Sequence, residues 1–359
     1  MKKGKKEEKE KKAEEEKKRK KTDITKLRRI VQIIAFILFI YGGLFITAQH
    51  VDSVIMPFVK PPTRGVKQSH LEPQTEYDEV FDTYFPTRTC RYIGTDTRLY
   101  RACAMHFLTE VPIYGVPLID FLPHLFFFLI LAFLLSRFMC GWLCPLGSIQ
   151  DFLNWVRKKL RLNYLKLPRF FLNIFEKFRY IWLVFLFVMA IAIVIPALGL
   201  VHLERDLNII TCNTCPGRIF FPILTGDMPS WWVFHNPINT TLSILGIVFF
   251  IIFLLSFFGK RLWCKICPTG ALLSLFNKGG AITKVKDVEK CTKCGICERV
   301  CPMDNKKVFQ EKNKKIVNSY NCINCFRCID KCPEDNTLKV KFFKWDIFKS
   351  KYKDKKKKL

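Results

Sequence analysis

Acidic residues and histidine are scarce in this chain. Its 359 residues include 31 Asp and Glu against 59 Lys and Arg, a formal net charge of +28, and only six His. Half of the residues are nevertheless hydrophobic. A large charge and a high apolar content coexist when they are segregated along the chain, as in a membrane protein with basic flanks. The composition therefore predicts membrane spans rather than two or three soluble domains.

Two further features are missing. No secretory leader is recognisable, because the first apolar run is too long, follows a long charged segment and lacks a small-residue cleavage site; we expect this run to be a retained membrane anchor. The sequence also presents no general base, nucleophile or substrate pocket, so quinone oxidoreduction is the most enzymatic activity that it supports. The many cations would suit nucleic-acid binding, but they flank apolar runs, and we expect no nucleic-acid partner.

Four apolar runs define the predicted fold class, an α-helical membrane protein with four transmembrane helices and a small α+β module at its C-terminal end. The helices are expected at about residues 30–48, 117–139, 180–200 and 240–258, because about 20 residues cross about 30 Å of hydrocarbon. They belong to a membrane domain at 27–280, with outer loops at 49–116 and 201–239. Residues 1–26 are predicted to be a charged disordered arm, 281–341 the module, and 342–359 a Lys-rich tail.

Lys and Arg near the span ends decide the predicted orientation. They gather on one side of a four-span arrangement, whereas acids and bases are nearly balanced in the two loops on the other side. The excess of cations on cytosolic loops therefore places both termini and the module in the cytosol. The predicted location is a multi-pass protein of the cytoplasmic membrane, in contact with lipid. Aromatic and basic residues at 149–177 are typical of a helix lying in the membrane interface.

One cysteine pattern is repeated in the module. The spacing C-x2-C-x2-C-x3-C-P begins at Cys291 and again at Cys322, and it is the spacing of bacterial ferredoxins with two [4Fe-4S] clusters, in which the fourth cysteine of each run binds the other cluster. The predicted ligands are thus Cys291, Cys294, Cys297 and Cys332 for one cluster and Cys322, Cys325, Cys328 and Cys301 for the other. A zinc site has no use for the third cysteine of each run, and the reducing cytosol disfavours disulfides.

Eight further cysteines form two sets. Cys140 and Cys144 follow the second apolar run, and Cys264 and Cys267 follow the fourth, so these four cysteines, which we call the membrane-edge set, are expected at the cytosolic ends of two spans. Convergence of the four would suit a further cluster, a bound metal or a pair of redox-active dithiols; alternatively, each Cys-Pro ends a helix and its cysteines pack as small apolar residues. Cys90, Cys103, Cys212 and Cys215 fall in the outer loops, where disulfides, a bound metal or cluster, and disulfide exchange with a partner remain alternatives.

All six histidines fall in the outer loops or at the outer ends of spans. Of these, His50, His124, His202 and His235 are candidates for binding haem or a quinone at the outer face; the alternative is that they are ordinary exposed loop histidines without a cofactor. If electrons cross the membrane, a mobile quinone or a fixed centre near the span ends must bridge it, because about 30 Å of hydrocarbon is too thick for a single hop from cytosolic clusters. The ferredoxin clusters alone therefore do not complete a transmembrane circuit.

Four motifs together resemble the polyferredoxin-like membrane proteins. They are Leu27-Arg-Arg-Ile-Val-Gln32, Cys140-Gly-Trp-Leu-Cys144-Pro-Leu-Gly147, Trp263-Cys-Lys-Ile-Cys-Pro268 and the doubled ferredoxin signature. The family includes the ferredoxin-type quinol dehydrogenase component of periplasmic nitrate reductase systems and the iron–sulfur membrane portion of the nitrous-oxide reductase maturation factor. Cys140 and Cys144 match its C-x3-C-P motif, whereas Cys264 and Cys267 lie one residue closer together. The flavin-attachment sequence of the larger maturation factors is not visible, so no covalent outer flavin is expected.

The resemblance implies four transmembrane helices, cytosolic iron–sulfur clusters and electron exchange between a cytosolic or quinone pool and an extracytoplasmic redox protein. The leading hypothesis is therefore a membrane-bound electron-transfer protein that passes single electrons through two [4Fe-4S] clusters. Two alternatives remain open at this point. The first is an assembly or maturation factor that supplies reducing equivalents to an extracytoplasmic metalloprotein, and the second is a redox-sensing membrane regulator.

Overall fold

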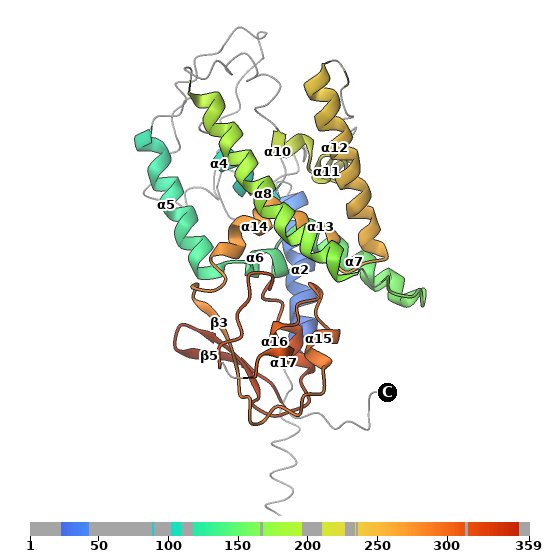
Figure 1. Cartoon of the computed structure of the whole chain (residues 1–359), viewed down its shortest axis with the longest axis vertical. Helices are drawn as coiled ribbons and strands as arrows, with labels where there is room; N and C mark the ends of the chain where they lie inside the picture. Colours follow the sequence, from blue (N-terminus) through green and yellow to red (C-terminus); the bar gives the residue numbers. More distant parts are fainter. Residues whose placement is uncertain are drawn as a thin grey trace, which may run out of the picture.

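Four long helices and a small α+β module make up most of the described chain. The computed structural model describes residues 23–42, 88–89, 102–109, 118–165, 168–195, 210–226, 234, 236–312 and 315–351. The long helices are α2 (Ile24–Tyr41), α5 (Leu118–Leu135), α8 (Arg169–Val194) and α12 (Pro237–Leu254). In Figure 1, α5, α8 and α12 occupy the upper part, and α2 lies lower and reaches the module. Thr25 of α2 donates a hydrogen bond of 2.7 Å to Asp330 of the module.

Each predicted span corresponds to one of these helices, with shifted ends. Helices α2 and α8 begin six and eleven residues before the predicted spans at 30–48 and 180–200, because a helical backbone continues through the basic residues that flank an apolar run. Among the described residues, the segment Pro237–Phe257 is the one helix that is long and apolar enough to cross a membrane by length and composition. A crossing by all four helices therefore stays a prediction.

Two helix–turn–helix units lie at the lower end of the long helices. One joins α6 (Phe138–Trp142) to α7 (Pro145–Lys159), and the other joins α13 (Leu262–Ile266) to α14 (Pro268–Leu275). In both units a Cys-Pro pair forms the turn: Cys144 and Cys267 cap the second helix in an extended conformation, and proline is its first residue. Proline suits this position because the first N–H of a helix has no intrahelical partner, while the residue before proline is driven to an extended backbone.

The module contains an antiparallel sheet in the order β3-β4-β5 and three short helices. Its elements are β3 (Ile282–Lys286), α15 (Ile296–Arg299), α16 (Lys307–Gln310), α17 (Arg327–Lys331), β4 (Leu338–Phe342) and β5 (Trp345–Lys349). Strand β5 comes from the segment predicted as a Lys-rich tail, so the module extends at least to residue 349. Aromatic and β-branched residues favour a strand there, and Phe348 packs against Phe326 with ring centroids 5.8 Å apart.

The module is docked on the two helix–turn–helix units. Trp142 of α6 is buried in the core of the module with Phe326 and Val340, and its indole Nε1 donates a hydrogen bond of 2.9 Å to the carbonyl of Asn324. Ala281, just before β3, donates its backbone N–H to the carbonyl of Phe133 in α5 at 3.2 Å. The sheet and the helices therefore share buried surface.

Parts of both predicted outer loops pack into the helical domain. These parts are the two-residue strands β1 (Arg88–Thr89) and β2 (Ala102–Cys103) and the helices α4 (Ala104–Thr109), α10 (Ile210–Asn213) and α11 (Gly217–Thr225). Met105, Ile210 and Phe221 are buried in the same core as Trp182 and Phe253. Their apolar side chains gain more by packing between the helices than by remaining on a loop surface, so these segments of 49–116 and 201–239 are integral parts of the helical domain.

Candidate metal centres

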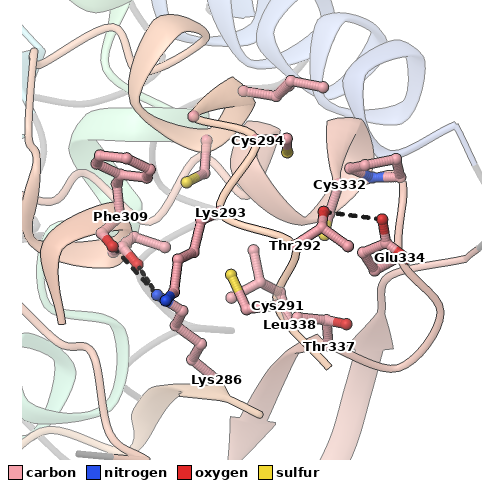
Figure 2. Close-up of a pocket in the computed structure, with 15 residues that line it drawn as sticks. Lys286, Cys291, Thr292, Lys293, Cys294, Phe309, Cys332, Glu334, Thr337 and Leu338 are labelled. Atoms are coloured by element: carbon pink, nitrogen blue, oxygen red, sulfur yellow. Dashed lines mark hydrogen bonds between the residues drawn. The ribbon is translucent and has the colours of Figure 1, made fainter. Parts of the chain in front are cut away.

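Four cysteines line one pocket of the module. Cys291, Cys294 and Cys297 come from the first cysteine run, and Cys332 comes from the end of the second. Figure 2 shows the pocket, which these thiols share with apolar and basic side chains that include Ile296, Val308, Phe309, Leu338 and Lys286. The structure therefore brings together the four residues that ferredoxin spacing predicts for one cluster, including the cysteine from the other run.

The remaining four module cysteines also lie near one another. Burial, with the neighbouring thiols of Cys325 and Cys322 acting in the same direction, raises the pKa of Cys301 to about 12. Burial likewise raises the pKa of Cys328 well above its usual value, with Cys322, Cys325 and Cys301 acting in the same direction. Cys301, from the first run, is thus a close neighbour of the three cysteines of the second.

Both cysteine runs share an unusual backbone. The residues on either side of the second cysteine have positive φ in each run: Lys293 (52°) and Gly295 (70°) flank Cys294, and Asn324 (48°) and Phe326 (56°) flank Cys325. Positive φ costs a non-glycine residue about 1 kcal/mol or more, so the strain is retained for a reason. Such left-handed turns point successive N–H groups into a concavity that binds anions and iron–sulfur centres. The backbone therefore fits a negatively charged cluster in each run.

Among the residues that the structure describes, no three His, Cys, Asp or Glu side chains converge closely enough to bind a single metal ion. A [4Fe-4S] cluster makes no such demand, because each of its cysteines binds a different iron. The spread of the thiols and the left-handed turns are both compatible with cubane clusters in the module.

The membrane-edge cysteines converge from the two helix–turn–helix units. Burial and the nearby thiols of Cys267 and Cys264 outweigh the opposing charge of Arg137 and raise the pKa of Cys140 to about 11. Burial also raises the pKa of Cys144, where Cys140, Cys264 and Cys267 all contribute. These four cysteines therefore lie near one another although their sequence segments are more than 100 residues apart; Cys264 and Cys267 are buried, and Cys140 and Cys144 are half-buried.

Each unit contributes one arginine that binds the cysteine motif of the other unit, an arrangement that we call the arginine exchange. Arg137 donates from Nη2 to the carbonyl of Cys264 at 3.1 Å, and Arg261 donates from Nη1 to the carbonyl of Cys140 at 3.0 Å. Each arginine precedes the first cysteine of its own motif by three residues and binds the first cysteine of the other. Both guanidinium groups are almost completely buried. The exchange ties the two cysteine pairs together.

Two glycines leave room for this exchange. A Cβ on Gly147 would lie 2.9 Å from the Cys140 carbonyl and 3.3 Å from Arg261, and a Cβ on Gly270 would lie 3.1 Å from Arg137. Each glycine follows the second cysteine of its motif by three residues. Each copy of the repeated pattern therefore contains Arg-x2-Cys, then a second cysteine followed by proline, and then a glycine two residues after that proline. These arginines and glycines are not among the predicted site residues, although their repeated spacing is visible in the sequence.

We call Cys291, Cys294, Cys297 and Cys332 the first set of the module, and Cys301, Cys322, Cys325 and Cys328 the second set. The membrane-edge set adjoins the second set. Cys264 and Cys325 are buried in one apolar cluster with Met303 and Ile323, and Cys140 and Cys301 pack against it. Gln150 of α7 also donates to the Cys264 sulfur at 3.4 Å. The three cysteine sets therefore follow one another from the Cys294 end of the module to the ends of the long helices.

Asp151 of α7 is the anion at the centre of this junction. Its carboxylate accepts hydrogen bonds from Arg28 of α2 and from Arg261, the latter at 2.7 Å, and Arg327 of α17 lies 3.7 Å away. Burial alone would raise the pKa of Asp151, but the charges of Arg261, Arg28 and Arg327 outweigh it and hold the pKa well below its usual value. One carboxylate thus joins both helix–turn–helix units to the module.

Most outer candidates lie outside this arrangement. Cys90, His50, His202 and His235 are outside the described residues, and of His124 only the backbone, in α5, is described. Cys212 lies in α10, and Cys103 and Cys215 pack against the main core. That core also includes Cys267 of the membrane-edge set, and Cys144 of that set packs against it, whereas neither Cys103 nor Cys215 lines the pocket of Figure 2.

Two family models match the chain. A 4Fe-4S binding domain matches residues 124–163 and 240–286, the two segments that contain the membrane-edge cysteines. A 4Fe-4S dicluster domain matches residues 283–333, which contain both ferredoxin runs. The models thus divide the chain at the same place as the cysteine sets.

Several characterised and uncharacterised proteins are similar to the chain. An uncharacterized protein of Methanocaldococcus jannaschii is 30% identical over 210 residues, which cover 57% of this chain and 73% of that protein. The ferredoxin-type protein NapH of Escherichia coli is 28% identical and is covered over 60% of its length. The regulatory protein NosR of Pseudomonas aeruginosa is 22% identical, and only 24% of its length is covered. No solved structure matches the chain.

Proposed function

The chain belongs to the polyferredoxin-like family of iron–sulfur electron-transfer proteins, and from this premise we propose that it is a membrane-bound component that passes single electrons between a cytosolic or quinone donor and an extracytoplasmic redox partner. The observation that carries the proposal is the packing of Cys301 and Cys325 against Cys140 and Cys264. At this contact, cysteines of the module lie next to cysteines at the ends of the long helices.

In this proposal the eight module cysteines hold two [4Fe-4S] clusters, which supply one-electron redox chemistry when bound. Cys291, Cys294, Cys297 and Cys332 hold the first, in the pocket of Figure 2. Cys301, Cys322, Cys325 and Cys328 hold the second, next to the helices. Apolar side chains around the sulfurs exclude water, and Cys294 is the exposed cysteine of the eight. The Cys294 end is therefore the end at which a cytosolic partner would exchange electrons.

The membrane-edge set holds a third iron–sulfur cluster in this scheme. Cys144 and Cys267 each cap the N-terminus of a helix, where the helix dipole favours a thiolate. Arg137 and Arg261 are buried beside the set, where their charges oppose the increase that burial causes in the pKa of Cys140 and Cys264. Arg261 shares the carboxylate of Asp151 with the buried Arg28. This surplus of buried positive charge suits an anionic cluster better than neutral thiols, and the match of a 4Fe-4S binding domain to 124–163 and 240–286 supports the same choice.

The outer surface of the long helices supports a membrane location. Ile33 and Ile34 of α2, Phe126 of α5, Ile181 of α8 and Ile251 of α12 are all at least half exposed. Many exposed apolar side chains on long helices are typical of contact with lipid or another protein, and a helix satisfies its own backbone hydrogen bonds in lipid. Four spans, with both termini in the cytosol, remain the topology that we propose.

Iron and acid-labile sulfide per chain test the cofactor assignment. Two clusters would give about eight irons and three would give about twelve. We expect Cys144→Ser and Cys267→Ser to lower the count by about four, while Met139→Leu, a volume-conserving change at a buried neighbour of Cys140, leaves it unchanged. A count near eight in the unmodified protein that neither serine variant lowers would exclude the third cluster.

Quinol oxidation tests the donor. The purified protein in lipid is mixed anaerobically with a quinol, and bleaching of the cluster absorption is followed. Reduction by quinol supports a quinone-linked circuit. If dithionite bleaches the absorption and quinol leaves it unchanged, the quinone-linked version fails and a cytosolic donor remains. Absorption that neither reagent changes would contradict the electron-transfer role itself.

A redox-sensing or maturation role is the second candidate, favoured by the similarity to proteins named regulatory protein. Deletion of the chain distinguishes it from respiratory transfer. A maturation role predicts an extracytoplasmic metalloprotein that is present but lacks its metal. A regulatory role predicts altered expression of target genes, without loss of electron flow in membranes already supplied with their terminal reductase.

A further inference from the structure

Strand β3 carries two lysines on its buried face. Ile282, Lys284 and Lys286 alternate with half-exposed residues, and the two lysines are only 2% and 4% exposed. A buried ammonium group is costly unless hydrogen bonds and charges compensate it. Each lysine therefore needs partners that offset the free energy of its desolvation. The partners of Lys284 are different from those of Lys286.

Lys286 is bound entirely by the backbone. Its Nζ donates to the carbonyls of Val308 at 2.9 Å, Phe309 at 3.2 Å and Glu311 at 2.8 Å. An ammonium group has three donors, so none remains for a cysteine sulfur. Lys286 lines the pocket of the first cysteine set, but it fastens the end of α16 to the sheet.

Lys284 is bound to a cysteine. Its Nζ donates to the Cys322 sulfur at 3.1 Å and to Asn324 Oδ1 at 2.6 Å. The amide of Asn324 is itself held from the helical domain, because its Nδ2 donates to Ser136 Oγ at 3.1 Å and to Asn277 Oδ1 at 3.2 Å. The ammonium group is therefore fixed beside one sulfur of the second set by a network that spans the docking interface.

We propose that Lys284 sets the reduction potential of the cluster held by Cys301, Cys322, Cys325 and Cys328, raising it above that of the cluster held by Cys291, Cys294, Cys297 and Cys332. This inference rests on the proposed function. Reduction adds one electron, and no proton, to a cluster with four thiolates, and so increases the negative charge on its sulfurs. A cationic donor at a ligand sulfur stabilises the reduced form more than the oxidised one.

The asymmetry gives the module a direction. One electron lost by the cluster at Cys291 is one electron gained by the cluster at Cys322, with no other bond made or broken. The favoured acceptor is the set that packs against Cys140 and Cys264. Lys284 therefore makes electron transfer favourable from the exposed end of the module toward the long helices.

Redox titration of the full-length, iron-loaded protein, followed by electron paramagnetic resonance, tests this proposal. The two signals are assigned with Cys294→Ser, which alters ligation in the first set. We expect Lys284→Met to lower the potential of the second cluster so that the distribution of one electron between the clusters shifts at least tenfold, which corresponds to about 59 mV. Lys284→Arg, which keeps charge and donors, should recover part of the shift. Lys286→Met is the matched control, because it removes an equally buried charge from the same strand face without removing a sulfur hydrogen bond.

Two results would overturn the proposal. The first is that Lys284→Met leaves the reduction potentials of both clusters unchanged. The second is that Lys286→Met lowers the potential of the second cluster as much as Lys284→Met does. If Lys284→Met loses iron, the unmodified protein decides instead: with ¹⁵N-labelled lysine, a hyperfine coupling between one nitrogen and the second cluster supports the proposal, and its absence overturns it. A protein that binds no iron would refute the proposed function itself, which is a separate outcome.

Discussion

Arg137 donates a hydrogen bond to the carbonyl of Cys264, 127 positions further along the chain, and thereby fastens one membrane-edge cysteine motif to the other. A second bond from the same guanidinium, of 3.1 Å, reaches the carbonyl of Tyr320 in the module. Arg137 therefore joins three segments: the turn before α6, the α13 motif and the loop that leads into the second cysteine run.

Replacing Arg137 tests how much this junction contributes. Arg137→Gln leaves two carbonyls without their donor, at about 1–3 kcal/mol for each buried unsatisfied group, so we expect the free energy of unfolding to fall by about 2–5 kcal/mol. Arg137→Lys should recover only part, because one ammonium does not reproduce the planar fork of a guanidinium. Thermal unfolding in detergent and iron per chain measure both effects.

The control for this change is Arg299→Gln. Arg299 also donates to a cysteine carbonyl, that of Cys294 at 3.3 Å, but it lies at the surface. Water replaces its hydrogen bond, so the cost should be within about 0.5 kcal/mol. If Arg137→Gln and Arg299→Gln lower the free energy of unfolding equally, the buried hydrogen bonds of Arg137 contribute no more to stability than a hydrogen bond at the surface.

Gly141 of α6 should be the most sensitive glycine at the docking interface. A Cβ at this position would lie 2.2 Å from the carbonyl oxygen of Ile323, a backbone atom that side-chain rotation does not move. We expect Gly141→Ala to separate the module from α6, with a loss of at least about 1–3 kcal/mol for overpacking and faster proteolysis between α14 and β3. Gly279→Ala is the matched control, because nothing lies within 4 Å of its Cβ. Identical proteolysis of the two variants would contradict the close contact.

Much of the candidate site is predictable from the sequence because the cysteine spacing is local. The crossed pairing of Cys301 and Cys332 follows from a ferredoxin rule, and the structure brings both residues to the sets that the rule predicts. The Arg137–Cys264 exchange does not follow from any local rule, since it needs two helix–turn–helix units to face each other. The repeated Arg-x2-Cys and the glycines were available as a signal, but only the fold explains why both copies keep them.

The two buried lysines show the limit of periodicity. The pattern Ile-Thr-Lys-Val-Lys predicts a strand, but alternation alone would place either Thr283 and Val285 or the lysines toward the core. The lysines are buried because a cysteine sulfur and four oxygen atoms on that side of the strand accept hydrogen bonds from their ammonium groups. Likewise, the lysine-rich composition of the tail concealed β5, in which Trp345, Ile347 and Phe348 favour a strand.

Asp151 gives a prediction about pH. Because its native pKa lies well below the usual value of about 3.9, its ion pairs stabilise the fold fully above that pH and lose this contribution only as the pH falls through the native pKa. Asp151→Asn leaves Arg28, Arg261 and Arg327 without their shared carboxylate and should cost about 3–5 kcal/mol. The difference between the two proteins should therefore be constant from about pH 5 to pH 8.

Unfolding at several pH values in that range measures this difference. Asp346→Asn, at the exposed pair with Lys349 on β5, is the control and should change little at any of them. A difference between the unmodified protein and Asp151→Asn that shrinks from pH 8 to pH 5 would place the pKa of Asp151 near or above its usual value and contradict the buried network.

The crossed ligation of the two module clusters is testable with Lys284 as a marker. Cys301→Ser changes the first cysteine run, yet it should damage the cluster of the second; Cys332→Ser should do the reverse. In the Cys332→Ser background, Lys284→Met should still lower the potential of the remaining intact cluster. In the Cys301→Ser background it should leave that potential unchanged, because the surviving cluster has no bond to Lys284. If each serine instead damages the cluster of its own run, the responses to Lys284→Met exchange between the two backgrounds, and the crossed assignment is wrong.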